Sequence, residues 1–102
     1  PLNPNAIPGL TVRDMTVTET PLGYNIRMPA TVTDWEARRN IMKVEIEGLT
    51  YGEGGAFMEN ETGNCYFDAY MCQGTLGDIL IVHYYDWDKR PIGEIEFRKV
   101  IH

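Results

Sequence analysis

The residues best suited to binding chemistry lie together around position 87. Trp87 stands between Asp86 and Asp88, directly after Tyr85, where the following Lys-Arg-Pro marks a turn. An exposed indole stacks on the C–H faces of a sugar while nearby carboxylates bind its hydroxyls, and the same side chains are frequent at protein–protein hot spots. Trp35 is a second tryptophan that strand alternation does not assign to the core. We therefore expect a surface built from Trp87, Asp86, Asp88, Tyr85 and Trp35 that binds carbohydrate or protein.

The same aromatic residues have a structural interpretation. Large rings also cap the open ends of a small β-sandwich core, and Trp87 would then be a core residue rather than a ligand contact. If the binding interpretation holds, Tyr66, Tyr70 and Tyr84 could widen the aromatic surface. Trp87→Ala distinguishes the two interpretations: a variant that keeps its fold but binds ligand more weakly favours the binding surface, and loss of the fold would make Trp87 a core residue.

The chain offers little for catalysis or metal binding. It contains no serine, His83 and His102 are its two histidines, and it has no G-x-x-x-x-G-K-[ST] phosphate loop. The two cysteines and two histidines lack the paired spacing of a zinc site. We expect no catalytic residue, no metal and no cofactor. The enzyme alternative is a base at the amine of Pro1, as in tautomerases, but the two long helices that those enzymes need are not predicted here.

Cys65 and Cys72 are seven residues apart, and this odd spacing puts them on opposite faces of a continuous strand. If the chain reversed at Asp68-Ala69, the two cysteines would face each other and a disulfide would be possible. Asp-Ala, however, lacks the Gly or Asn that tight hairpin turns favour. We therefore expect free thiols that are mostly buried.

The elements that must position these residues are strands, because apolar residues recur with period two along most of the chain. An irregularity at Asp14 predicts a bulge or a change of sheet within the first strand. Pro29 predicts that the second strand ends there or lies at an edge. The cleanest alternation is 42–46, where Met42, Val44 and Ile46 face inward. The expected strands are 10–18, 24–28, 42–47, 57–59, 64–71, 78–85 and 92–100.

One short helix is predicted between the second and third strands. Thr33 and Glu36 have the S/T-x-x-E spacing of a capping box, and residues 36–39 could follow as helix. Gly52, Gly54 and Gly55 predict a loop, after which 57–59 and 64–71 form a hairpin. The run 78–85 is long and apolar enough for a central strand, and Ile95 and Phe97 should face inward in the last strand.

About seven strands at regular spacing predict an all-β fold of the sandwich class. The run Gly77 to Asp86, a short turn, and Gly93 to Phe97 resembles the last hairpin of bacterial immunoglobulin-like and fibronectin type III-like modules. The cysteine pair and central tryptophan of antibody domains are missing, so the resemblance extends to architecture alone. It implies an immunoglobulin-like antiparallel β-sandwich with at most one short helix, acting as a module of a larger surface, secreted or virion protein, without catalysis.

Length and charge bound the remaining possibilities. The 102 residues suffice for one domain, which we place at 10–102 after a proline-rich linker at 1–9. A net charge of −6 disfavours nucleic acid as a partner, and no apolar run is long enough to cross a membrane. Between Lys43 and Lys89 the chain has nine acidic residues and no Lys or Arg. This stretch is either a solvated acidic surface or a contact for a basic protein.

Two functions therefore remain open from sequence, besides the enzyme alternative. The first is a non-catalytic module that binds carbohydrate or protein or spaces neighbouring domains, outside the cell or at its surface, with the virion or the cytoplasm as alternatives. The second is a small acidic stand-alone protein that binds and blocks a basic partner, whose affinity would fall steeply with salt.

Overall fold

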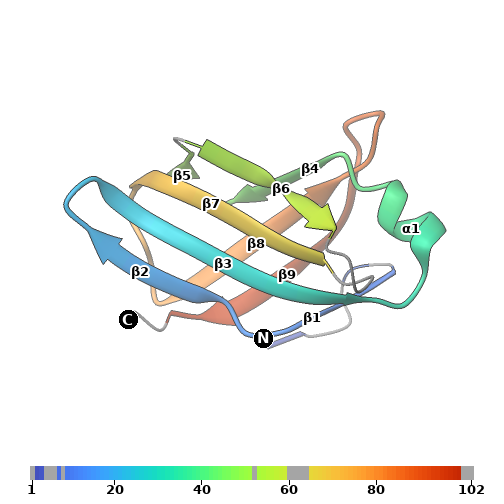
Figure 1. Ribbon diagram of the computed structural model, residues 1–102, viewed down its shortest axis with the longest axis horizontal. Coiled ribbons are helices and arrows are strands. Elements are labelled where there is room, and N and C mark those ends of the chain that lie inside the picture. Colours follow the sequence, from blue (N-terminus) through green and yellow to red (C-terminus); the bar gives the residue numbers. More distant parts are fainter. Residues whose placement is uncertain (1, 4–6, 8, 52, 60–64, 100–102) are drawn as a thin grey trace.

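The computed structural model describes residues 2–3, 7, 9–51, 53–59 and 65–99, with backbone alone at 53–59. These residues form two antiparallel sheets packed face to face, so the fold is an all-β sandwich, as expected (Figure 1). One helix, α1 (Trp35–Arg39), joins the two sheets. The six-stranded sheet contains β1 (Leu10–Val12), β2 (Thr16–Thr20), β3 (Gly23–Val32), β5 (Leu49–Thr50), β6 (Glu53–Glu59) and β7 (Cys65–Gly74). The three-stranded sheet contains β4 (Lys43–Ile46), β8 (Ile79–Tyr85) and β9 (Pro91–Arg98).

The strand order places β3, β7 and β8 inside their sheets. In the larger sheet, β3 pairs with β1 and β2 on one side and with β7 on the other, and β7 pairs in turn with β5 and β6. In the smaller sheet, β8 lies between β4 and β9, which confirms the expected central strand. All these pairings are antiparallel. The expected hairpin across 57–71 is confirmed by the β6–β7 pairing, while its turn lies outside the described residues.

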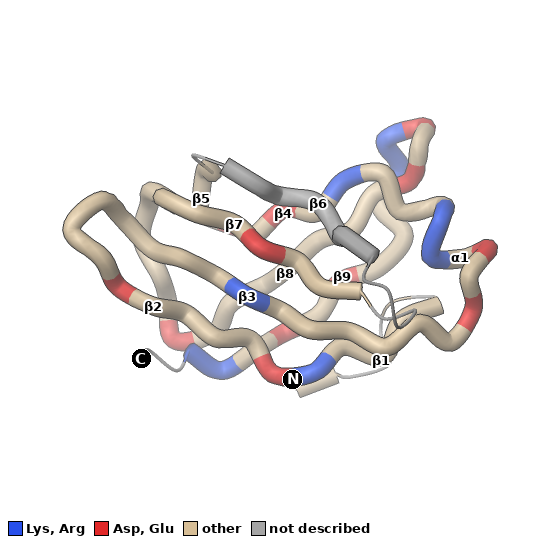
Figure 2. Tube along the Cα trace, viewed as in Figure 1, with Lys and Arg blue, Asp and Glu red and all other residues tan. Residues whose placement is uncertain are grey.

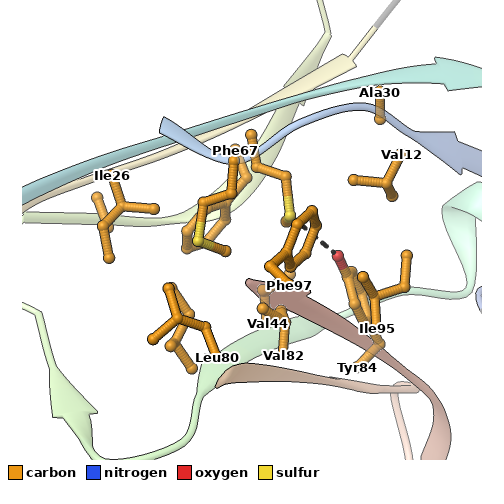
Figure 3. Close-up of a cluster of buried hydrophobic side chains, with 14 of the residues drawn as sticks. Val12, Ile26, Ala30, Val44, Phe67, Leu80, Val82, Tyr84, Ile95 and Phe97 are labelled. Atoms are coloured by element: carbon orange, nitrogen blue, oxygen red, sulfur yellow. Dashed lines mark hydrogen bonds between the residues drawn. The ribbon is translucent and has the colours of Figure 1, made fainter. Parts of the chain in front are cut away.

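The core consists of the inward-facing residues of both sheets (Figure 3). Tyr84 from β8 and Phe67 from β7 are its largest fully buried side chains. The Tyr84 hydroxyl donates a hydrogen bond to the Met28 sulfur at 3.7 Å, shown as the dashed line in Figure 3. The predicted inward positions Val44, Ile46, Ile95 and Phe97 are buried, and Met42 is half-buried.

The expectation that Pro29 ends a strand or lies at an edge is wrong. β3 continues through Pro29 to Val32 and is paired on both sides. The Pro29 carbonyl accepts a hydrogen bond from the Arg13 amide at 2.9 Å, at the break between β1 and β2. Residues 13–15 lie between the stretches of β1 and β2 that pair with β3, so the missing N–H of Pro29 removes no regular ladder bond on that side. The irregularity expected at Asp14 is thus a break within one sheet, not a change of sheet.

The helix begins one residue later than the capping box predicts. Asp34, not Thr33, is the N-cap, and its Oδ1 accepts hydrogen bonds from the amides of Glu36 at 3.0 Å and Ala37 at 3.4 Å. Asp and Thr are both good N-cap residues, so local sequence leaves the choice between adjacent positions open. The Thr33 amide instead donates to the Gly9 carbonyl at 2.9 Å.

Cys65 and Cys72 are both buried and free, as expected, and the strand runs without reversal between them. The expectation that they occupy opposite faces is wrong. The β3–β7 register shifts by one residue between Tyr24 and Ile26, and Met71 takes a positive φ of 53°. This bulge inserts an extra residue into β7, so an odd sequence spacing returns Cys72 to the core side.

The glycine-rich segment is a strand in part rather than a loop. Gly54 and Gly55 lie inside β6, where the register with β7 shifts between Gly54 and Ala56. Glycine within a strand accompanies such bulges, because it accepts the irregular backbone that side chains disfavour. Gly52 lies outside the described residues.

The described residues of the N-terminal segment contact the sandwich. The Leu2 amide donates to the Glu96 carbonyl at 2.7 Å, and the Asn3 side chain accepts from the Glu96 amide at 2.6 Å. Ile7 is buried in the core, and Gly9 supplies the carbonyl that holds the residues before α1. This segment therefore covers part of the outer edge of β9.

Candidate functional site

Trp87 lies in the turn between β8 and β9, and 69% of its surface is exposed. Its Nε1–H donates a hydrogen bond to the Arg39 carbonyl at 2.9 Å. Arg39 is the last residue of α1, so this bond joins the turn to the helix at one end of the sandwich (Figure 1). The core interpretation of Trp87 is therefore wrong: the indole is anchored by its edge while most of its surface faces solvent. We call the turn 86–90 together with α1 the Trp87 end.

Asp86 shapes this turn. Its Oδ1 accepts hydrogen bonds from the amides of Asp88 and Arg90, each at 2.9 Å. The Asp86 amide donates to the Arg90 carbonyl at 2.9 Å, and Lys89 completes the turn with a positive φ of 63°. Side-chain bonds of this kind are the reason that Asp is frequent in turns. Asp88, in contrast, is exposed.

Tyr85 lies beside a shallow hollow at the base of the turn. The Lys43 ammonium group lies 5.7 Å from the centre of the Tyr85 ring and also pairs with Glu45 at 3.2 Å. The hollow has a volume of about 320 Å³ and is lined by Met42, Lys43, Glu45, Tyr85 and Lys89. Two apolar or aromatic residues and three charged ones thus line a hollow beside the turn that carries Trp87.

Trp35 is the first residue of α1 and is half-buried. The helix therefore carries Trp35 at its start and the acceptor for Trp87 at its end. Of the residues expected from sequence, Asp86, Trp87 and Asp88 thus lie in the turn of the Trp87 end and Trp35 lies in its helix, while Tyr85 precedes the turn as the last residue of β8.

The remaining tyrosines do not extend this surface as expected. Tyr84 is fully buried in the core, where burial raises the pKa of its hydroxyl, so the expectation that it widens the aromatic surface is wrong. Tyr66 and Tyr70 lie on β7 in the other sheet. They belong to a second cluster.

That second cluster, which the sequence did not reveal, covers the outer side of the six-stranded sheet. Arg27 Nε contacts Asp68 Oδ1 at 3.0 Å, and the Arg27 guanidinium lies 4.9 Å from the centre of the Tyr66 ring. The Tyr70 hydroxyl donates to Asp68 Oδ2 at 3.0 Å. Figure 2 shows the basic position on β3 beside the acidic one on β7. The i, i+2, i+4 spacing of Tyr66, Asp68 and Tyr70 was a signal for one shared face, but the pairing with Arg27 depends on register.

The acidic stretch between Lys43 and Lys89 is not one uniform surface. Asp68 is paired with Arg27, and Glu45 with Lys43. Glu47 lies 3.0 Å from Nε2 of His83, whose Nδ1 lies 3.6 Å from Glu94. Several carboxylates of the stretch thus pair with side chains of the same domain. Only the other carboxylates of the stretch are left to pair with a basic partner.

The two thiols are shielded. Both cysteines are buried, and burial raises the pKa of the Cys72 thiol. Arg38, which is also buried, donates from Nε to the Cys65 sulfur at 3.3 Å. A protonated thiol enclosed in a core is a poor nucleophile.

Comparison with known proteins adds no further assignment. No family model matches the chain, and neither does any curated protein or solved structure. Among the described residues, no group of three His, Cys, Asp or Glu side chains could hold a metal ion. None of the helices in the part of the chain that the structure describes has the length and apolar character needed to cross a membrane. The candidate sites therefore rest on their geometry.

Proposed function

We propose that this chain is a non-catalytic, immunoglobulin-like binding module of a larger surface, secreted or virion protein, and that its Trp87 end contacts a protein ligand. The observation that carries the proposal is the exposed indole of Trp87, fixed by its hydrogen bond to Arg39. Tryptophan is enriched at hot spots because it buries a large area at little cost in side-chain entropy.

The strand order supports the immunoglobulin-like part of the proposal. One sheet has the order β1–β3–β7 with β6 beside β7, and the other has the order β4–β8–β9. In chain order these correspond to strands A, B, E and D facing C, F and G of constant-type immunoglobulin domains. The turn 86–90 is then the F–G loop, and α1 lies in the B–C loop. In antibody variable domains these two loops form part of the antigen-binding end.

The hydrogen bonds at the Trp87 end favour a protein over a sugar. The Trp87 N–H is used by Arg39, and Asp86 Oδ1 is used by two backbone amides. These groups are therefore used within the protein, which leaves fewer polar groups for sugar hydroxyls, with Asp88 as an exposed carboxylate beside the indole. The remaining surface is an exposed indole next to the hollow at Tyr85, with charged groups around it. An aromatic anchor inside a charged rim is the usual composition of a protein interface.

The test is capture of surface and secreted proteins on immobilised wild type, Trp87→Ala and Leu22→Ala. Leu22 is a matched control, because it is 68% exposed and lies in the β2–β3 turn, outside the Trp87 end. We expect a protein retained by wild type and Leu22→Ala and lost from Trp87→Ala. With that protein purified, Trp87→Ala should weaken Kd by about thirtyfold, the effect of losing a hot-spot side chain.

Far-UV circular dichroism and thermal unfolding establish that each variant is folded. If folded Trp87→Ala retains the same proteins with unchanged Kd, the Trp87 end is not the ligand contact and the proposal fails.

A further inference from the structure

We infer that the outer side of the six-stranded sheet is a second binding site, built for a neutral oligosaccharide. We call it the Arg27 face; its residues are Thr16, Thr18, Asn25, Arg27, Tyr66, Asp68 and Tyr70. The inference does not rest on the proposed function, because these residues lie on β2, β3 and β7 and not at the Trp87 end.

Strand register sets two rows of side chains across this face. Thr16 pairs with Arg27, and Arg27 pairs with Asp68, which gives a row across three strands. Thr18 pairs with Asn25 in the neighbouring row. A hollow of about 170 Å³ lies over both rows and is lined by Thr16, Thr18, Asn25, Ile26, Arg27, Asp68 and Tyr70. Polar groups from three strands thus converge on one depression.

The ion pair in this face positions side chains for a ligand. The Asp68 side chain is only 7% exposed, although it lies on the outer side of the sheet, whereas that of Arg27 is 60% exposed. Removing a carboxylate from water is costly, and such pairs add little to stability. Asp68 holds Arg27 Nε on one oxygen and the Tyr70 hydroxyl on the other. It therefore fixes an exposed guanidinium and an exposed phenol ring at once.

The groups left to a ligand match the needs of sugar hydroxyls. Asp68 takes Nε of Arg27, which leaves the terminal amino groups of this side chain as donors. Asn25 uses its oxygen for the Met71 amide at 3.2 Å, so its NH₂ group remains as a donor. The hydroxyls of Thr16 and Thr18 both donate and accept. Hydroxyl-rich ligands need this mixture of donors and acceptors.

Aromatic rings and charge define the ligand further. Tyr70 is 41% exposed and supplies a ring for the C–H face of a sugar. Tyr66 lies four residues away along β7, about 13 Å by strand geometry, with the Arg27 guanidinium over its ring, and together they extend the face beyond a single sugar. Arg27 and Asp68 balance each other, and the protein carries a net charge of −6, which repels anionic polymers. A neutral oligosaccharide is the ligand class that these features fit.

The test is an NMR titration of the ¹⁵N-labelled protein with neutral oligosaccharides of six sugars: β-linked gluco-, xylo- and manno-oligosaccharides and malto-oligosaccharides. Oligogalacturonate serves as the charged control. We expect at least one neutral ligand to give saturable shifts at the amides of Thr18, Arg27 and Asp68, while the Trp87 indole N–H signal stays in place. Tyr70→Ala should weaken that Kd by about tenfold, and Tyr70→Phe, which keeps the ring, should weaken it less.

Three results would overturn the inference: no saturable shift with any neutral ligand, shifts confined to Trp87 and its turn, or tighter binding of oligogalacturonate. Trp87→Ala separates this site from the proposed function, since it should leave oligosaccharide binding intact. Tyr70→Ala should conversely leave protein capture intact. The experiments can therefore contradict the inference about the Arg27 face without contradicting the proposed function, and the reverse.

Discussion

At the scale of single residues, the structure distinguishes side chains that shape the backbone from side chains that face solvent. Asp86 and Asp88 look equivalent in sequence, yet Asp86 closes the turn with its carboxylate while Asp88 is exposed. Tyr84 and Tyr85 are adjacent, yet one is fully buried and the other half-buried. Asp68 is buried on the outer side of a sheet because Arg27 and Tyr70 both bind it.

The Asp68–Tyr70 contact predicts a measurable pKa. The Asp68 carboxylate accepts a hydrogen bond from the Tyr70 hydroxyl and repels the phenolate. Both effects raise the pKa of Tyr70 above its ordinary 10.0. Asp68→Asn should lower this pKa toward 10, because the amide carries no charge. The chemical shift of a Tyr70 ring carbon, followed by NMR as pH rises, measures the pKa of Tyr70 in wild type and in Asp68→Asn. Equal midpoints in wild type and Asp68→Asn would contradict the assigned cause.

At the scale of elements, the short helix α1 and the turn after β8 depend on each other. Five residues cannot form a stable helix alone, so α1 depends on its cap and on its contacts. Asp34 satisfies two amides at its start, and the Trp87 indole binds the carbonyl at its end. The helix and the turn after β8 therefore stabilise each other.

Asp34→Ala tests this dependence. Loss of the cap should lower the free energy of unfolding by about 1 kcal/mol, measured by urea denaturation. It should also shift the NMR signal of the Trp87 indole N–H, because fraying of α1 loosens the Arg39 carbonyl that accepts its hydrogen bond. Thr33→Ala is the matched control and should change neither quantity, since Thr33 is not the cap. If Thr33→Ala costs as much as Asp34→Ala, the assignment of the N-cap is wrong.

At the scale of the whole molecule, the sandwich encloses polar groups that must stay neutral. Tyr84 is fully buried, and the ring of Tyr51 packs against the same core. The Tyr51 oxygen accepts a hydrogen bond from the Ile46 amide at 2.6 Å. Burial raises the pKa of Tyr51 to about 12 and that of Tyr84 further. Each buried side-chain nitrogen and oxygen of the described residues has a hydrogen-bond partner. The described core thus contains polar side-chain atoms, and each of them has a hydrogen-bond partner.

These tyrosines predict loss of stability at alkaline pH. Their pKa values are higher in the folded than in the unfolded chain, so the folded chain binds more protons above pH 10 and the free energy of unfolding falls as pH rises. The contribution of Tyr84 is fully present below pH 10 and should decline above it by about 1.4 kcal/mol per pH unit. Tyr84→Phe should therefore flatten this decline between pH 10 and 11, as followed by urea denaturation. An unchanged slope would contradict the burial effect.

The sequence by itself determined most of the strands and, where their alternation is regular, which residues face the core. Alternation is a local property: Val44, Ile46, Ile95 and Phe97 fall on one face because successive side chains of a strand point in opposite directions. The same locality explains why the turn at Trp87 and the helix α1 could be predicted. It also explains the errors at Pro29 and Cys72, because breaks and bulges depend on the neighbouring strand.

Only the tertiary structure decided which distant residues meet. Arg27 and Asp68 come together through the β3–β7 register, and the bulge at Met71 restores the inward phase of that strand. Trp87 is anchored to Arg39, 48 residues away in sequence. The first pair depends on strand register within a sheet and the second on how the ends of the two sheets are joined, and no periodicity within a single segment contains either arrangement.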